Sequence, residues 1–365
     1  MENKTDKEGA MVTLEGGGEP LLSVRNLKVH FPMDEGRVRA VDGVSFDVQP
    51  GQVVGIVGES GCGKSVTMKA ILRIVEPPGR IVEGQIMYHS RASGEAGTSK
   101  VRGTIDLVGL APNGKEMRDI RGAEIALIPQ EPMAAFSPVH TVGNQVIEAI
   151  RLHRDLSKSA ARQLAVDTFR DVGISMPEQR IDSYSWQMSG GLRQRAMIAM
   201  ALAANPRLLI ADEPTTAIDV TTQAQILRLL RKLRFEYNSA IIFITHDLGV
   251  IAQMADYVVV MYLGKVMAQG PVDDLFHNPL HPYTQALLRS IPSVQSTPRV
   301  KLPTISGSIP HAFNRPKGCP FHPRCTSFMP GVCDRDEPEL KAVDGRQLVS
   351  CFLFRDTPEV ANGQA

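Results

Sequence analysis

VVGIVGESGCGKSVTMKAILRI, residues Val53–Ile74, is the stretch around which the rest of this chain is organised. Its first five residues are mostly β-branched and apolar, which is typical of a buried strand. The glycine-rich loop that follows fits the pattern G-x-x-x-x-G-K-[ST] of a P-loop, and apolar residues at helical spacing begin after Lys64. A chance glycine-rich turn seldom stands between a strand and a helix, so the stretch predicts a phosphate site.

The chemistry of the loop follows from its residue types. Glycines let backbone N–H groups face phosphate oxygens, and the helix N-terminus adds a partial positive charge. We expect Lys64 to reach the terminal phosphates and the Ser65 hydroxyl to ligate Mg²⁺. The residues of this stretch predicted to contact a bound nucleotide are Gly58, Glu59, Ser60, Gly61, Cys62, Gly63, Lys64, Ser65 and Val66.

Composition limits the class of protein. The chain has 365 residues, 43% hydrophobic and 22% charged, which is typical of a globular protein with a core. A net charge of +1 argues against nucleic acid as the main partner. The sequence has no apolar run of the roughly 18–20 residues that span a bilayer, and its N-terminus has no apolar signal core. We therefore expect a cytosolic protein.

Strand and helix patterns alternate along the chain, which predicts an α/β fold. After the P-loop strand, strands are expected at 125–129, 208–211 and 240–245, with helices at 142–153, 160–172 and 221–237 between them. This order favours a P-loop NTPase core, a mostly parallel sheet with helices on both faces. Two alternating runs ahead of the P-loop, 22–32 and 38–48, predict an additional antiparallel β layer.

Changes in composition suggest the domain organisation. Residues 1–20 are polar and glycine-rich, which predicts a disordered tail. A nucleotide-binding domain is expected over 21–290, with a helical subdomain over about 131–204 and a flexible insertion at 91–102. Prolines, glycines and cysteines dominate afterwards, so we expect a small Cys-rich C-terminal domain over 291–357 and a frayed tail over 358–365.

A second motif, LLIADE at 208–213, supplies acidic groups at the end of a buried strand. Asp212 can hold Mg²⁺ through water, and Glu213 can orient and deprotonate an attacking water molecule. A strand that merely ends in solvated acids is the alternative. The P-loop makes the catalytic interpretation the better one.

A third motif, SGGLRQR at 189–195, lies just upstream of these acids. Here the chain resembles the ATP-binding cassette (ABC) ATPases, whose signature is a Ser-Gly-Gly loop at a helix start. The resemblance implies that this loop closes over the ATP held by a partner's P-loop. The residues concerned are Ser189, Gly190, Gly191, Leu192, Arg193 and Gln194. The match is looser at Met188 and Leu192, where the family usually has Leu and Gln.

Further positions match the order of motifs in that family. Gln130 stands at the Q-loop position, where the resemblance implies contact with Mg²⁺ or water and sensing of a membrane partner. Asp219, in Ala217–Asp219, matches the D-loop. His246 matches the switch histidine that contacts the γ-phosphate, and Phe31 matches the aromatic residue that stacks on adenine.

The resemblance narrows to the oligopeptide/dipeptide importer ATPases, a group that includes nickel and opine relatives. The segments that carry it are FSP at 136–138, ADEPTTAIDV at 211–220, THDLGV at 245–250, HPYT at 281–284 and KGCPFHPRC at 317–325. It spans roughly 22–351, apart from the insertion. Only one set of motifs occurs, so the resemblance implies a second, related or identical ATPase subunit as partner.

The implied machine is a membrane importer. It would contain two membrane permease subunits, docked near 130–142, and an extracytoplasmic binding protein that acts indirectly. This chain would lie peripherally on the cytoplasmic face of the membrane and hydrolyse ATP to drive import of di- or oligopeptides. Nickel chelates or oligosaccharides are alternative cargoes, because cargo is not encoded in such a subunit.

Four cysteines near the C-terminus, Cys319, Cys325, Cys333 and Cys351, are spaced C-x5-C-x7-C-x17-C. The spacing lacks the C-x2-4-C knuckle usual for zinc. The family resemblance implies a structural [4Fe-4S] cluster, which four Cys thiolates can hold. Zinc and free thiols remain alternatives, as do two other functional classes: a non-transport ABC ATPase and a metal-cluster sensor that uses ATP only to change shape.

Overall fold

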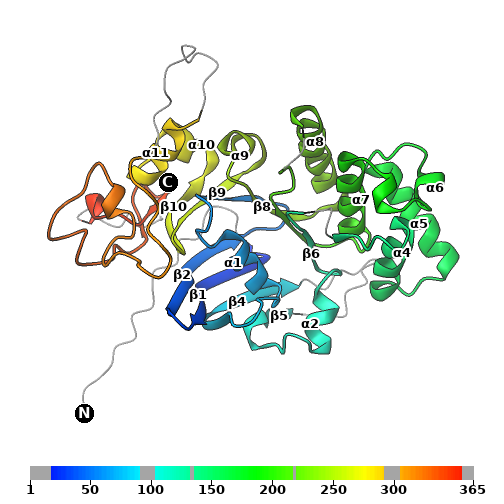
Figure 1. Ribbon diagram of the computed structural model, residues 1–365, viewed down its shortest axis with the longest axis horizontal. Coiled ribbons are helices and arrows are strands. Elements are labelled where there is room, and N and C mark those ends of the chain that lie inside the picture. The colour runs from blue at the N-terminus through cyan, green and yellow to red at the C-terminus, as the bar shows by residue number, and fades with distance from the viewer. Residues whose placement is uncertain (1–17, 91–102, 132–134, 217–218, 292–304, 356–365) are drawn as a thin grey trace.

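The computed structural model describes residues 18–90, 103–131, 135–216, 219–291 and 305–355. Two sheets form its framework (Figure 1). The expectations for the N-terminal tail up to 17, the insertion at 91–102, residues 217–218 of the D-loop and the tail at 358–365 concern residues outside these ranges. The predicted domain boundary near 290–300 also falls largely outside them.

The smaller sheet is antiparallel, as the two runs ahead of the P-loop predict. Its order is β2-β1-β4-β5. Its strands are β1 (Leu22–Met33), β2 (Gly36–Val48), β4 (Arg80–Ser90) and β5 (Gly103–Asp106). Val29 pairs with Val41 on one side of β1 and Val24 with Ile86 on the other. These side chains are fully buried, so the apolar face of this sheet packs inward.

The larger sheet has the order β11-β12-β10-β9-β3-β8-β7-β6. Its strands are β3 (Val53–Val57), β6 (Ile125–Ile128), β7 (Leu208–Asp212), β8 (Ala240–Ile244), β9 (Tyr257–Tyr262), β10 (Lys265–Pro271), β11 (Lys341–Ala342) and β12 (Leu348–Val349). The five strands from β9 to β6 run parallel. The predicted fold class is confirmed.

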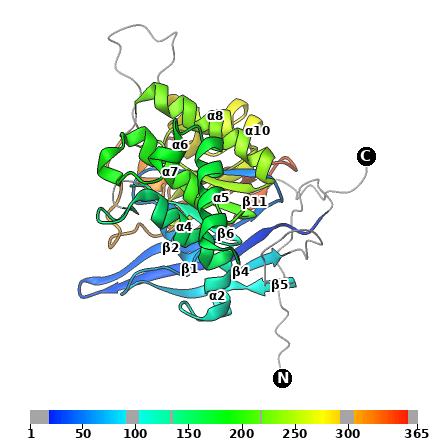
Figure 2. The same ribbon diagram turned by 90° about the vertical axis from the view of Figure 1, so that its right-hand side faces the viewer.

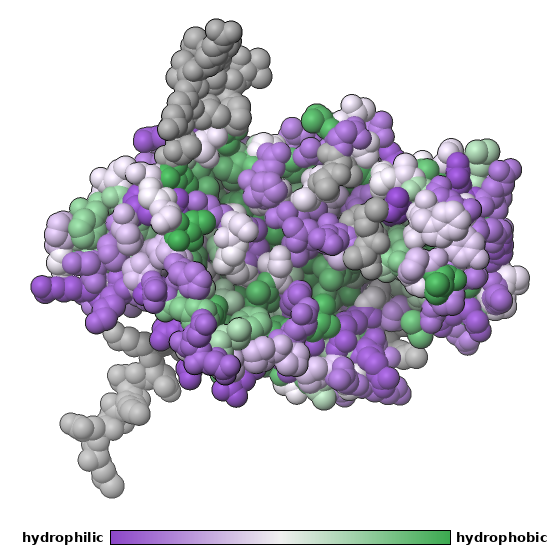
Figure 3. Space-filling model, viewed as in Figure 1, coloured by the Kyte–Doolittle hydropathy of each residue, from purple (hydrophilic) through white to green (hydrophobic). Residues whose placement is uncertain are grey.

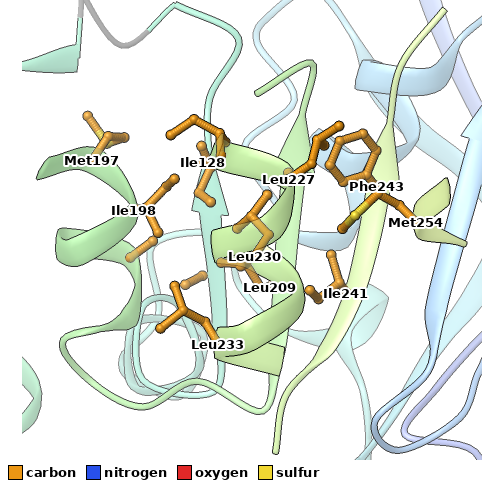
Figure 4. Close-up of a cluster of buried hydrophobic side chains, with 14 of the residues drawn as sticks. Ile128, Met197, Ile198, Leu209, Leu227, Leu230, Leu233, Ile241, Phe243 and Met254 are labelled. Atoms are coloured by element: carbon orange, nitrogen blue, oxygen red, sulfur yellow. The ribbon is translucent and has the colours of Figure 1, made fainter. Parts of the chain in front are cut away.

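Both faces of the parallel strands are covered, which explains their continuous apolar sequences. In β8, Ile241 and Phe243 join one buried cluster, whereas Ile242 and Ile244 join the other. Figure 4 shows side chains of α7 and α8 directed at strands β6 to β8 on the first face. The antiparallel sheet and α1 contribute to the cluster on the second face.

The helices fill the connections between strands. They are α1 (Lys64–Ile71), α2 (Lys115–Ile120), α4 (Val142–His153), α5 (Lys158–Asp171), α6 (Pro177–Arg180), α7 (Gly190–Leu202), α8 (Val220–Tyr237), α9 (Leu248–Met254), α10 (Val272–His277) and α11 (Pro282–Arg289). Helices α4 to α7 gather at one end of the molecule (Figures 1 and 2).

The C-terminal segment lies at the opposite end from α4–α6 (Figure 1). Its strand β12 pairs with β10, through Ala268 with Val349, and β11 pairs with β12. The segment therefore extends the main sheet at its edge. Strands of two residues leave no alternation to read, and the sequence did not predict them.

The surface drawn in Figure 3 is mostly hydrophilic at both ends, with hydrophobic residues showing mainly toward the middle. No helix in the described ranges has both the length and the apolar content needed to cross a membrane.

A buried histidine makes stability dependent on pH. His281 precedes α11, is 1% exposed, and its Nδ1 accepts the Tyr283 N–H at 2.9 Å. Burial lowers the pKa of His281 from 6.5 to about 4. Between these values the unfolded chain binds a proton that the folded chain does not. This contribution to stability is therefore complete above pH 6.5 and is lost as the pH falls toward 4.

We expect protonation of His281 in the unfolded chain to lower the free energy of unfolding by about 2 kcal/mol when the pH falls from about 7.5 to about 5. Urea unfolding at both pH values measures the loss. His281→Asn keeps an acceptor at the helix N-terminus but does not titrate, so its stability should fall less over the same interval. An equal fall in wild type and variant would assign the pH dependence to other groups.

Candidate active site

The P-loop joins β3 to α1 in the predicted order. Gly63 precedes α1 with φ of 102°, and a Cβ there would lie 2.2 Å from the Ala40 carbonyl oxygen. At Gly58 a Cβ would lie 2.1 Å from the Met261 carbonyl oxygen. Both glycines are required by close backbone approach as well as by conformation.

Lys64 is folded into this loop. Its Nζ donates to the carbonyl oxygens of Gly58 at 2.7 Å and Glu59 at 3.1 Å, and the residue is only 6% exposed. The cation is therefore held at the loop where the sequence predicts terminal phosphates. Cys62 is buried beside it, and burial raises the pKa of its thiol.

Ser65 and Asp212 meet across the sheet although 147 residues separate them. The Ser65 hydroxyl donates to Asp212 Oδ1 at 3.1 Å. Burial raises the pKa of Asp212, with the Ser65 hydrogen bond and the Lys64 charge opposing the shift. A hydroxyl and a carboxylate oxygen at one point are donors that Mg²⁺ favours, so the two residues fit the predicted metal role.

Glu213 follows β7 with φ of 47°, a backbone region that few non-glycine residues occupy. Its backbone N–H donates to the Ile244 carbonyl at 3.0 Å, which fixes the turn against β8. Its carboxylate accepts from Thr216 Oγ1 at 2.8 Å and Gln130 Nε2 at 3.2 Å. Strain of this kind often marks a functional position.

His246 completes this group. Its Nδ1 lies 3.3 Å from Glu213 Oε1, and its side chain is 64% exposed. Burial pushes the pKa of Glu213 upward, but hydrogen bonds from Thr216 and His246 outweigh it, and the pKa is lowered overall. Glu213 is therefore an ionised carboxylate at neutral pH, as a general base requires.

Comparisons with known proteins show which protein family this chain is similar to. The family model "ABC transporter" matches residues 41–216, and "Oligopeptide/dipeptide transporter, C-terminal region" matches 267–333. The oligopeptide transport ATP-binding protein OppD of Bacillus subtilis is 44% identical, covering 94% of this chain and 92% of that protein. The dipeptide transport ATP-binding protein DppD of Escherichia coli is also 44% identical, covering 90% and 95%.

This chain belongs to the ATP-binding subunits of the oligopeptide/dipeptide ABC transporter family. The resemblance found in the sequence is confirmed.

Solved structures agree on the fold of this ABC subunit. A dimeric ATP-binding cassette, MJ0796, bound to ADP and Pi matches with a TM-score of 0.58 and 25% identity, covering 69% of this chain and 98% of that one. CbiO1 of Clostridium perfringens matches with a TM-score of 0.56 and 23% identity, covering 72% and 92%.

The predicted signature loop of the ABC subunit opens α7. Ser189 Oγ accepts the Leu192 N–H at 3.4 Å, so this residue caps the helix. Ser189 and Gly190 are exposed, and a Cβ at Gly190 would meet no atom within 4 Å. The backbone of the helix start is therefore open to an outside group. Gln194 does not fit the predicted contact with a partner's ATP, because it is 1% exposed and buried within the protomer.

Two further predicted positions have local roles in the structure. Asp219 caps α8, with its carboxylate accepting the Thr222 N–H at 2.9 Å and the Thr222 hydroxyl at 2.7 Å. Phe31 lies at the end of β1 and is partly exposed, with its ring directly against Gly79. A larger residue at 79 would displace the ring, so this glycine helps to keep Phe31 in place.

The predicted [4Fe-4S] cluster is not supported. Among the described residues, which include all four cysteines, no group of three or more His, Cys, Asp or Glu is arranged to hold a metal ion. None of the four is in a disulfide. Burial raises the pKa of Cys319 to about 12 and of Cys351 to about 11, and the nearby thiols of Cys325 and Cys333 add to both shifts.

Three residues at the site were not predicted from the sequence. Thr216 binds the Glu213 carboxylate, and it could have been suspected from its position three residues after Glu213. Tyr283 and Arg324 both contact Glu59 in the P-loop. Both lie in segments that carry the family resemblance, HPYT and KGCPFHPRC, but nothing near them in sequence indicates a contact with Glu59, which is more than 200 residues away.

Proposed function

We propose that this chain hydrolyses ATP to drive the import of di- or oligopeptides across the cytoplasmic membrane. The observation that carries the proposal is the convergence of Lys64, the Ser65–Asp212 pair and Glu213 on one site, in a chain 44% identical to peptide transport ATP-binding proteins. The names of those relatives, OppD and DppD, support a peptide cargo.

Each residue has a role in the proposed reaction. The P-loop N–H groups and Lys64 bind the phosphates, and Phe31 stacks on adenine. Glu213 accepts a proton from the attacking water, while His246 contacts the γ-phosphate. Mg²⁺, held by Ser65, by Gln130 and, through water, by Asp212, would neutralise charge that develops on the transferred phosphoryl group.

We further propose that two such subunits share the reaction. Ser189 and Gly190 present an exposed helix N-terminus, which favours an anion, yet one protomer already has a P-loop for its own γ-phosphate. The second anion site fits a partner's ATP, an arrangement consistent with the dimeric ATP-binding cassette that matches this fold. Asp219, at the D-loop position, would face the same partner.

Gln130 gives a route from the reaction to the membrane subunits. It donates to the Glu213 carboxylate at 3.2 Å and lies two residues after β6, ahead of α4 in the sequence. In this proposal, two permease subunits dock near 130–142 on the cytoplasmic side. An extracytoplasmic binding protein then supplies the peptide.

Reconstitution with the permease subunits that co-purify with this chain tests the proposal. Proteoliposomes containing the complex and its binding protein should take up a labelled tripeptide only when Mg-ATP is present on this subunit's side. The same vesicles with Glu213→Gln should bind the tripeptide but not accumulate it. ATP hydrolysis without uptake of any di- or oligopeptide would contradict the peptide assignment and favour another cargo or a non-transport ATPase.

A further inference from the structure

A buried arginine from the C-terminal segment reaches into the P-loop. Arg324 lies in a short 3₁₀ turn, His322–Arg324, between Cys319 and Cys325, and its side chain is 4% exposed. Its Nη1 and Nη2 donate to the two carboxylate oxygens of Glu59, at 2.6 and 3.0 Å. A paired, two-bond contact of this kind is the strong form of an Arg–carboxylate interaction.

The guanidinium is also fixed from its other sides. Its Nε donates to the Ser306 carbonyl at 3.1 Å, and its Nη1 lies 3.3 Å from the Tyr262 hydroxyl. These contacts leave Arg324 little freedom to follow Glu59 if the loop moves. The arginine therefore acts as a fixed point toward which the P-loop is held.

Glu59 is held at its backbone as well as its side chain. Its N–H donates to the Tyr283 hydroxyl at 3.0 Å, and its carbonyl accepts from Lys64 Nζ at 3.1 Å. The residue that Arg324 grips is thus bonded directly to the lysine that is predicted to reach the phosphates. A displacement of Glu59 would displace the contacts of Lys64.

An aromatic cluster fastens the C-terminal segment beside this contact. Phe321, Tyr262 and Tyr283 are nearly or fully buried, with ring centroids 4.8 to 5.4 Å apart. Phe321 belongs to the C-terminal segment, Tyr262 to β9 and Tyr283 to α11. Figure 1 shows that segment beside β10 and α11. The position of Arg324 is therefore set by packing, and not by its ion pair alone.

The negative charge of Glu59 explains why its ion pair with Arg324 matters for phosphate binding by the loop. The loop must accept a polyanion, and a free carboxylate within it would repel phosphate oxygens. Arg324 neutralises that carboxylate in a partly buried setting, where solvent screens little. We propose that Arg324 is a positioning residue for ATP binding, through which the C-terminal segment sets the affinity of the P-loop. This inference rests on the proposed function, because it takes ATP to be the ligand of the loop.

The test compares ATP binding and hydrolysis in charge variants of the full-length chain. Arg324→Gln should raise both the Kd for a fluorescent Mg-ATP analogue and the KM for ATP at least tenfold, with kcat at saturating ATP changed by less than about threefold. Arg324→Lys, which keeps the charge without the paired geometry, should lie between wild type and Arg324→Gln. The weakening should grow at low ionic strength, where charge repulsion is least screened.

The double variant Glu59→Gln/Arg324→Gln separates charge from general destabilisation. Removing the carboxylate as well should return the Kd to within about threefold of Glu59→Gln alone. Arg315→Gln is the matched control, because Arg315 also ties the C-terminal segment to the core, by ion pairs with Asp42 at 2.7 Å and Glu337 at 3.3 Å. It should leave the Kd for the ATP analogue within twofold of wild type.

Two results would overturn the inference: a Kd for Arg324→Gln within twofold of wild type, or a double variant that binds as weakly as Arg324→Gln. If Arg324→Gln does not unfold cooperatively on heating, the Kd values of Arg324→Lys and of the double variant decide the inference by the same thresholds. A wild-type chain that does not bind the analogue would instead overturn the proposed function itself, so the two failures are distinguishable.

Discussion

Replacing Glu213 by glutamine should lower kcat for ATP hydrolysis by about 10²- to 10⁴-fold while ATP stays bound, because the change removes a general base and little else. Gln is the same size as Glu and can still accept from Thr216, which now lies 2.8 Å from the carboxylate. The Ser65–Asp212 pair and the P-loop are untouched. Steady-state phosphate release and the Kd for Mg-ATP measure the two effects separately.

Glu236→Gln is the matched control for this variant. Glu236 lies on the exposed side of α8, paired with Lys232 at 3.4 Å, so the same chemical change there should leave kcat within twofold. In a pair of subunits, the slow Glu213 variant should also accumulate the ATP-bound dimer, which size-exclusion chromatography with Mg-ATP would detect. Hydrolysis at the wild-type rate would remove Glu213 from the role of base.

Ser189→Asp should reduce ATP hydrolysis by about 100-fold or more without weakening ATP binding to the P-loop. Aspartate caps a helix as well as serine does, so α7 should remain intact. Its negative charge, however, would face the partner's γ-phosphate at a helix start that should attract anions. Hydrogen-bond donors at such positions contribute about 10²- to 10³-fold to the rate. A carboxylate there would repel the γ-phosphate instead of stabilising it.

Ser157→Asp provides a control of the same chemistry at another helix. Ser157 caps α5 by accepting the Ala160 N–H at 3.2 Å, so its replacement should leave hydrolysis unchanged. The Ser189 variant should also inactivate mixed pairs with wild-type subunits at the site it covers. Full activity of Ser189→Asp, with normal folding, would show that the helix start does not cover a partner's nucleotide.

Local patterns in the sequence predicted the framework closely. The apolar spacing of 142–153 predicted the bounds of α4, and the strand–loop–helix reading of 53–74 matches β3 and α1, although α1 ends three residues earlier, at Ile71. Such patterns succeed because a helix face or a buried strand is defined by residues within a few positions of one another. The short helices α2, α6, α9, α10 and α11 and the strands β11 and β12 were missed, because helices of four to eight residues and strands of two give too little periodicity.

The sequence also predicted which residues would come together at the proposed nucleotide site. The P-loop, the acids after β7 and the histidine after β8 follow parallel strands, whose carboxyl ends lie at one edge of the sheet. Their exact contacts were not predictable. The positive φ of Glu213, the hydrogen bond from Thr216 and the burial of Gln194 depend on how β7, β8 and α7 pack together.

By itself, then, the sequence determined the class of fold and predicted the phosphate loop and the carboxylate proposed as general base, because each is written in residues that are near neighbours along the chain. Only the tertiary structure decided that four cysteines with a suggestive spacing form no metal-binding group in the described chain, and that Arg324 grips Glu59 from 265 residues away. Such contacts depend on which surfaces pack together when the C-terminal segment joins the edge of the main sheet. The spacing of residues along the sequence does not show which surfaces these are.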